Sequence, residues 1–200
     1  ARSAPRRLRI ITEPELIDQV RAELQSIRQA AIRLDAEQAE LSRAVKSEPP
    51  PRDLSERQAA LGERIASQSE TVQRLVSRAQ RNNLSDESLA GLLDDAASFV
   101  DGAARASQEA TQRIQRAAAE PRADEEAPAR INEEDRREIE ASQDEVRDEL
   151  GQLVRLLDNG QDAWVARRSV ERLLSDQRRL LEETMAMSGR TTGRTVDQLS

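Results

Sequence analysis

Two apolar heptad patterns separated by three prolines decide the fold. The first pattern reads IDQVRAELQSIRQAAIRLDAEQAELSRAV (residues 17–45), and the second reads LSERQAALGERIASQSETVQRLVSRA (residues 54–79), with KSEPPPRD between them. Apolar side chains recur at alternating spacings of three and four residues, which is typical of helices that pack along one stripe. The expected buried seams are Ile17, Val20, Leu24, Ile27, Ala31, Leu34, Leu41 and Val45, then Leu54, Leu61, Ile65, Val72, Leu75 and Ala79.

The two seams match each other as the arms of an antiparallel hairpin. Residues that face each other across such a hairpin have numbers that add to a constant, and the seam pairs here add to 99, beginning with Val45 and Leu54. The midpoint falls within Pro49–Pro51, where a helix cannot continue. The sequence therefore predicts an antiparallel helical hairpin over residues 13–83.

The first helix has a clear start signal. Thr12 stands at the N-cap, Pro14 in the first turn and Glu15 at the capping-box position. The residues before Thr12 alternate polar and β-branched apolar side chains, which is strand periodicity. Two interpretations of residues 1–12 stay open: the last strand of a preceding domain, or a disordered basic leader.

A second antiparallel pair is expected after Asn82-Asn83. Its seams are Leu93, Ala96, Val100, Ala103, Ser107, Ala110, Ile114 and Ala117, then Ile139, Gln143, Val146, Leu150, Leu153 and Leu157. Pairs that add to 253 place small residues of the first helix opposite large residues of the second, which fills a core at normal density. The connection is the acidic, proline-containing stretch 120–129.

A fifth helix is expected after Asn159-Gly160, because that pair is a helix C-terminus signal. Asp162 would cap the new helix. Its seam comprises Ala166, Val170, Leu173, Gln177, Leu180, Thr184 and Met187, and it is widened by Trp164, Leu174, Leu181 and Met185. A stripe this wide predicts a helix that buries two faces.

The expected fold is therefore all-α, an elongated bundle of about five helices built from antiparallel coiled-coil hairpins. We divide the chain into the leader (1–12), the first hairpin (13–83), the second hairpin with the fifth helix (84–189, with a flexible link near 120–131) and a linker to a further helix (190–200). The composition agrees, because 36% of the residues are hydrophobic and 34% charged but only 1% aromatic. Such a balance is typical of long helices with thin cores.

The missing residue types exclude several classes of function. The chain has no histidine and no cysteine, which excludes Cys/His zinc sites, iron–sulfur ligation and nucleophilic catalysis by these residues. The net charge of −7 argues against a nucleic-acid binder. We expect no stretch of this segment to contact a membrane directly, because none approaches the length of an apolar span.

The candidate polar clusters have simpler structural explanations. Carboxylate pairs occur at Asp94-Asp95, Glu125-Glu126 and Glu133-Glu134, on expected helix surfaces or in the link, where no dry pocket would shift their pKa values. The stretch from Asp158 to Asp162 resembles a Ca²⁺ loop but is better explained by helix capping. Arginines at positions 2, 6, 7 and 9 are expected to keep an edge strand soluble. We therefore expect no enzyme, no catalytic residue, no metal or cofactor and no small-molecule substrate.

Glutamines interrupt the seams at Gln38, Gln58, Gln68, Gln143 and Gln177. Polar seam residues cost stability but fix helix register and partner choice. In the predicted register no glutamine of the first hairpin faces another glutamine. Substitution of Gln38 by leucine is then expected to stabilise the hairpin.

The two ends of the chain carry a family resemblance. The strand-like RLRIIT (7–12) running into EPELI (13–17) resembles large, membrane-anchored bacterial envelope proteins in which an Ig-like domain precedes long coiled-coil helices. The stretch from DNG (158–160) through LLSDQR (173–178) to VDQLS (196–200) is similar to their helical repeats. The resemblance covers most of the chain, and it implies an architectural region in the bacterial cell envelope or periplasm, although a cytoplasmic location stays open. Lys46 as the only lysine is also typical of a GC-rich bacterial genome.

The expected function is a non-catalytic structural or protein-interaction module, such as a helical spacer, stalk or assembly region of a larger bacterial protein. Its partner would be another protein or a second copy, and it would bind through the apolar seams. The alternative is a signal-transmitting helical domain of a membrane-anchored sensor. Sensors of that kind favour continuous parallel helices, and the proline turn at Pro49–Pro51 argues against one.

Overall fold

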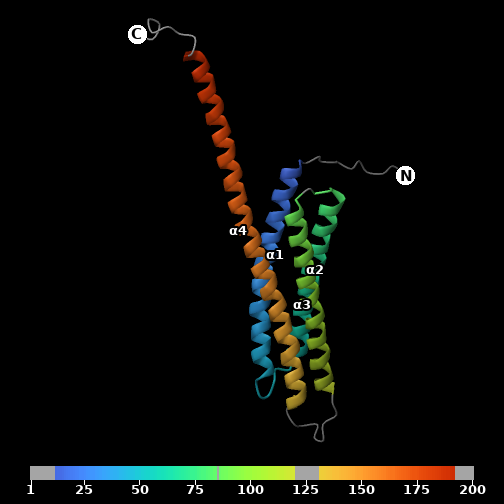
Figure 1. The fold of residues 1–200 in the computed structure, drawn as a ribbon. Helices are drawn as coiled ribbons and strands as arrows, with labels where there is room; N and C mark the ends of the chain where they lie inside the picture. The colour runs from blue at the N-terminus through green and yellow to red at the C-terminus, as the bar shows by residue number, and fades with distance from the viewer. Residues whose placement is uncertain (1–11, 85, 120–130, 192–200) are drawn as a thin grey trace, which may run out of the picture. The chain divides into compact units, whose positions relative to one another are not determined.

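The computed structural model describes residues 12–84, 86–119 and 131–191, and the regular secondary structure within these ranges is entirely α-helical. Its helices are α1 (Glu13–Val45), α2 (Leu54–Arg81), α3 (Glu87–Ala119) and α4 (Glu133–Thr191) (Figure 1). The all-α prediction is confirmed, and the strand-like leader up to residue 11 lies outside the described residues. The chain divides into two compact units, unit 1 (Ala1–Leu157) and unit 2 (Asp158–Ser200).

Unit 1 holds α1, α2, α3 and the first half of α4 in one bundle. Polar contacts join every neighbouring pair: Arg78 to Glu23 between α2 and α1 at 3.0 Å, Gln73 to Asp101 between α2 and α3 at 3.2 Å, Arg113 to Glu138 between α3 and α4, and Arg147 to Asp35 between α4 and α1 at 3.1 Å. Because the chain reverses at each connection, the neighbours are antiparallel. Both expected hairpins therefore share one hydrophobic core.

The expected registers agree with these contacts. Cross-helix polar contacts between α1 and α2 join residues whose numbers add to values between 96 and 101, around the predicted 99. The α3–α4 ion pair between Arg113 and Glu138 adds to 251, close to the predicted 253. Side chains that reach past the seam explain the small offsets.

Local signals set the helix ends in unit 1. Thr12 and Glu15 form the predicted capping box, in which the Thr12 backbone N–H donates to Glu15 Oε2 at 2.8 Å. Asn132 Oδ1 accepts from the backbone N–H of Asp135 at 2.7 Å and caps α4 as expected. At the end of α2, Asn83 has a φ of 47°, and the backbone N–H of Leu84 donates to the carbonyl oxygen of Ala79 at 3.2 Å, which is a Schellman stop.

The backbones of α2 and α3 approach each other more closely than those of α1 and α2 do. A Cβ atom added to Gly62 of α2 would lie 3.1 Å from Ser107 Oγ of α3, so glycine leaves little room to spare there. Several alanines of α3 are also buried in the bundle, namely Ala96, Ala103, Ala106 and Ala110. The small side chains of α3 and large ones of α4, such as Leu150, belong to the same core.

One expected boundary is wrong. Asn159 and Gly160 lie inside α4, which continues without a break from Glu133 to Thr191. A glycine in a helix costs only about 1 kcal/mol relative to alanine, and no proline follows to prevent the next turn. The residues expected to form separate fourth and fifth helices therefore belong to one long helix.

Candidate functional site

Most of the expected seam residues in unit 1 are buried. They are Val20, Leu24, Ile27, Leu34 and Leu41 of α1, Leu61, Ile65, Val72 and Leu75 of α2, Val100 of α3, and Leu150, Leu153 and Leu157 of α4. Ile17 is only partly buried, and Leu16 takes its place at 4% exposure. The correction follows from helix geometry, because a helix with 3.6 residues per turn drifts from a strict 3.5-residue repeat, and the stripe passes to the neighbouring position at the helix end.

A buried polar layer crosses the bundle, and each helix contributes one member. We call Gln38, Gln58, Ser107 and Gln143 the polar layer, and each is 0% exposed. Gln58 Nε2 donates to Gln38 Oε1 at 2.9 Å, and Gln38 Nε2 donates to Gln58 Oε1 at 3.3 Å. Gln58 Nε2 also donates to Ser107 Oγ at 3.4 Å, and Gln143 Nε2 donates to Gln58 Oε1 at 2.9 Å.

The polar layer corrects the expectation that no glutamine of the first hairpin faces another. Side chains from facing helices interdigitate, so a long amide reaches a residue one turn away from the one directly opposite. Gln38 therefore meets Gln58 even though the predicted register places it opposite Leu61. Gln68 is half-buried and Gln177 is exposed, so these two seam glutamines lie outside the layer.

The polar layer can hold register but offers no acid–base chemistry. Amides and a hydroxyl do not titrate near neutral pH, and they donate and accept hydrogen bonds only in fixed patterns. Gln143 Oε1 is buried and has no hydrogen-bond partner among the described residues. The layer is thus nearly satisfied, with one acceptor left over on α4.

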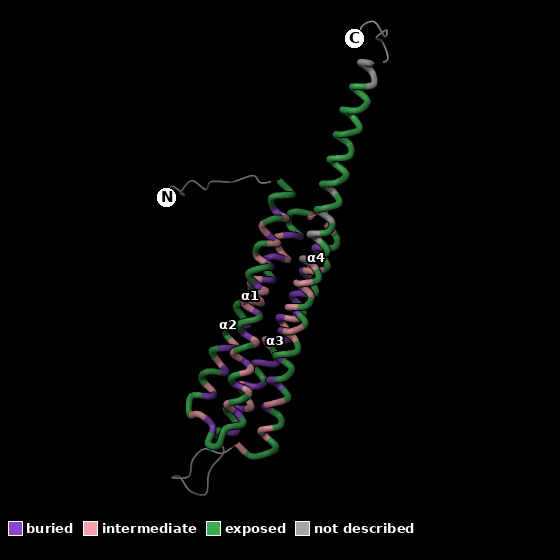
Figure 2. The backbone as a smooth tube through the Cα atoms, turned by 90° about the vertical axis from the view of Figure 1, so that its left-hand side faces the viewer, coloured by how far each residue is buried: buried purple, intermediate pink, exposed green. Residues whose placement is uncertain are grey.

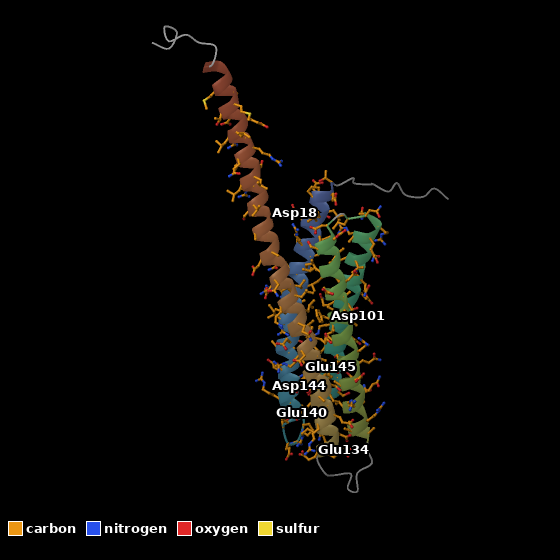
Figure 3. The ribbon with its side chains drawn as sticks, in the orientation of Figure 1. Asp18, Asp101, Glu134, Glu140, Asp144 and Glu145 are labelled. Carbon is orange, nitrogen blue, oxygen red and sulfur yellow. The ribbon has the colours of Figure 1, made fainter. Side chains whose placement is uncertain are left out.

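The carboxylates of unit 1 are spread over the bundle surface. Figure 3 shows Asp18 on α1, Asp101 on α3 and four further acidic side chains spaced along α4, at Glu134, Glu140, Asp144 and Glu145. Within the described part of the chain, no three potential metal ligands gather closely enough to hold an ion. Asp94, Asp95, Glu133 and Glu134 are exposed, as expected, whereas Glu125-Glu126 and the arginines at positions 2 to 9 lie outside the described residues. Asp158 and Asp162 are both part of α4, so the expected cap at Asp162 is absent.

Glu149 of α4 is a carboxyl whose pKa lies above its ordinary value. Burial raises the pKa of Glu149, Glu145 and Asp148 raise it further by repulsion, and Arg105 partly opposes them. The side chain of Glu149 lies over Gly102 of α3, where an added Cβ atom would come within 2.8 Å of its carboxyl carbon. Ionised Glu149 therefore sits in an environment that favours its neutral form.

Substitution of Glu149 by glutamine is expected to stabilise unit 1 at neutral pH. Because the folded-state pKa lies above the ordinary value of 4.5, the folded protein binds the proton more tightly than the unfolded chain does. The resulting contribution to the free energy of unfolding is fully present below the unfolded-state pKa and is lost as the pH rises through the folded-state pKa. Thermal unfolding should show a higher Tm for Glu149→Gln at neutral pH and no difference at about pH 3.5.

The matched control for that experiment is Glu56→Gln, which makes the same chemical change at an exposed position of α2. A gain in Tm that is equally large for both variants, or that persists at low pH, would contradict the explanation by burial.

Unit 2 presents a broad apolar stripe to solvent. Its members are 49% to 64% exposed and are Val170, Leu173, Leu174, Leu180, Leu181, Met185 and Met187, which we call the α4 apolar face. Much of the C-terminal part of α4 is drawn as exposed, in green, in Figure 2. The sequence predicted these residues in register but expected them to be buried. The expectation of burial is wrong for Val170, Leu173 and Leu180, because no described helix of unit 2 packs against them. The side chain of Trp164 lies outside the described side chains.

Charged residues flank the α4 apolar face without an excess of either sign. Arg179 pairs along the helix with Asp176 at 4.0 Å and with Glu183 at 3.8 Å. Such exposed pairs contribute little to stability. Unit 2 contains seven acidic and seven basic residues, so the net charge of −7 belongs entirely to unit 1.

Across residues 12–84, 86–119 and 131–191, no helix combines the length and the hydropathy needed to cross a bilayer. Comparisons with protein-family models, curated proteins and solved structures find no match to this chain. The α4 apolar face and the polar layer are therefore interpreted from their own chemistry.

Proposed function

We propose that this chain is a non-catalytic protein-interaction module, an assembly region of a larger bacterial protein. In this proposal unit 1 is a stable scaffold and the α4 apolar face is the docking surface. The observation that carries the proposal is the exposure of seven large apolar side chains on one stripe of one helix. Contiguous apolar surface of this kind marks interaction sites in soluble proteins.

The energetics support a docking role for this face. Full burial of a leucine contributes about 1.5–3 kcal/mol, and Leu173, Leu174, Leu180 and Leu181 are each about half exposed. Covering these four residues would contribute roughly 3–6 kcal/mol on that scale. The polar residues on the other side of the helix, such as Ser175 and Arg179, keep that side solvated. The helix is therefore amphipathic in the manner of a helix that packs against a partner.

Site-specific photo-crosslinking in cells that make the protein tests this proposal. A photoreactive residue at Leu173 or Leu180 is expected to give ultraviolet-dependent products of higher mass. The same residue at Ser175, which lies on the opposite side of the helix at 3.6 residues per turn, is the matched control and should give none. The proposal fails if crosslinking is absent at both leucines or equally strong at all three positions.

A further inference from the structure

We propose that the α4 apolar face docks onto the same face of a second copy of this chain, antiparallel and with the two Gln177 side chains meeting at the two-fold axis. This inference rests on the proposed function, in which the face is a docking surface, and it names the occupant. The argument uses the symmetry of the face, the behaviour of glutamine elsewhere in the chain, and the distribution of charge.

The face is symmetric about Gln177. Leu173 and Leu174 lie four and three residues before it, and Leu180 and Leu181 lie three and four residues after it. At 3.6 residues per turn, the members of each pair point to either side of the line through Gln177. In an antiparallel two-fold arrangement, the leucine pair before Gln177 in one copy meets the pair after Gln177 in the other. A layer of four leucines then forms on each side of the axis, and the interface is self-complementary, as two-fold symmetry requires.

Gln177 interrupts the centre of this face and needs a polar partner once covered. Unit 1 shows how the chain meets this need, because Gln38 and Gln58 are fully buried and bond to each other at 2.9 and 3.3 Å. A buried amide without partners is costly. A second copy supplies the matching amide at the same position through symmetry alone.

The charge distribution favours a second copy over an anionic membrane. Unit 2 has equal numbers of acidic and basic residues, so two copies of it do not repel each other through net charge. A helix that lies on an anionic membrane normally carries an excess of Lys and Arg on its polar side. Here Glu182 and Glu183 offset Arg178 and Arg179.

The charge of unit 1 favours the antiparallel orientation. Each unit 1 carries the whole net charge of −7 and joins unit 2 at Leu157–Asp158. The helix runs twenty residues from that junction to Gln177, so antiparallel pairing separates the two junctions by about 60 Å along the helix axis at 1.5 Å per residue. That distance exceeds the Debye length of about 8 Å at physiological salt. A parallel pair would place the two junctions, at each of which a strongly acidic unit is attached, at the same end of the interface.

The oligomeric state of the whole chain is the first test. Light scattering across a concentration series should show the mass rising from 22.3 kDa to twice that value. The double substitution Leu173→Gln with Leu180→Gln should weaken the dimer by about 100-fold or more, because four leucines leave the interface. Glutamine keeps helix propensity near that of leucine, so circular dichroism should be unchanged. Ser175→Gln is the matched control and should dimerise like the parent.

Disulfide trapping tests the orientation, since the chain contains no other cysteine. Leu173→Cys and Leu180→Cys are made separately and then oxidised alone or mixed. In the antiparallel pair the mixture should crosslink. Each variant alone should not crosslink. Along the helix axis, the two copies of residue 173 lie about 12 Å apart and the two copies of residue 180 about 9 Å apart, which is beyond the reach of a disulfide.

The outcomes separate this inference from the proposed function. Efficient crosslinking of either cysteine variant with itself, rather than in the mixture, would mean parallel copies and overturn the antiparallel arrangement. A chain that stays monomeric at all concentrations overturns self-association. If the photo-crosslinks at Leu173 and Leu180 then join a different protein, the docking surface stands and only the second copy is lost.

Discussion

Substitution of Gln58 by leucine is expected to lower the free energy of unfolding of unit 1 by on the order of 3 kcal/mol. Every hydrogen bond described within the polar layer has Gln58 as donor or acceptor. The substitution therefore leaves the amides of Gln38 and Gln143 buried without their partner, and unmade hydrogen bonds of buried groups cost about 1–3 kcal/mol each. Chemical denaturation monitored by circular dichroism measures the change.

The other positions of the polar layer supply the controls for that experiment. Gln38→Leu should destabilise less, because Gln58 keeps its bonds to Ser107 and Gln143. This expectation reverses the sign that the sequence alone suggested for Gln38. Gln143→Leu should be mildest, within about 1 kcal/mol of the parent, because it also removes the buried acceptor that lacks a partner among the described residues. An all-apolar layer, with Ser107→Ala and all three glutamines changed to leucine, should recover the parent stability or exceed it. Equal losses at the three glutamines would contradict the hydrogen-bond pattern.

Substitution of Gly62 by leucine is expected to have the second large effect, lowering the free energy of unfolding of unit 1 by about 1–3 kcal/mol. An added Cβ atom alone would lie 3.1 Å from Ser107 Oγ, so the larger leucine side chain should push α2 away from α3 and disturb the serine that bonds to Gln58. Helix propensity opposes the loss but is worth less than 1 kcal/mol. Thermal and chemical unfolding should both show the decrease.

Gly91→Leu is the matched control for Gly62→Leu. Both glycines lie inside helices, but a Cβ atom at Gly91 meets nothing within 4 Å. There the same substitution should stabilise the protein by about 0.5–1 kcal/mol, since only the propensity gain remains. Effects of the same sign at Gly62 and Gly91 would contradict the close approach of α2 and α3.

Spacing alone predicted much of the fold, because heptad patterns report which stripe of a helix is apolar. The capping box at Thr12, the stop at Asn83 and the hairpin register could all be derived from residue types at fixed intervals. The boundary at Asn159-Gly160 could not, because a glycine only weakens a helix and its neighbours decide whether the helix ends there. The caps and the proline turn of unit 1 were therefore predicted correctly from local sequence, whereas the helix end predicted at Asn159-Gly160 does not exist.

The candidate site was predicted less completely. The seam residues Val170, Leu173 and Leu180 were identified, but their spacing could not distinguish a stripe covered by the same chain from one left exposed. The polar layer shows the complementary difficulty. Gln38 and Gln58 were identified as seam positions. Their pairing, however, depends on the way in which long side chains interdigitate, and a register that pairs only directly opposite residues does not describe this. A polar residue in the seam of every helix of the bundle, here Gln38, Gln58, Ser107 and Gln143, is the signal that would have suggested a shared layer.

The long α4 also bears on how unit 1 folds. Contacts among α1, α2 and α3 join helices that are neighbours along the chain, with short connections between them. The contacts of α4 with the first hairpin reach back 88 residues from Arg136 to Glu48 and 112 residues from Arg147 to Asp35, whereas its ion pair with α3, between Arg113 and Glu138, spans only 25 residues. Local contacts form at lower loop-closure cost than distant ones. We therefore expect the contacts within each hairpin to form early, and the contacts between α4 and the first hairpin to complete the core as the final step of folding.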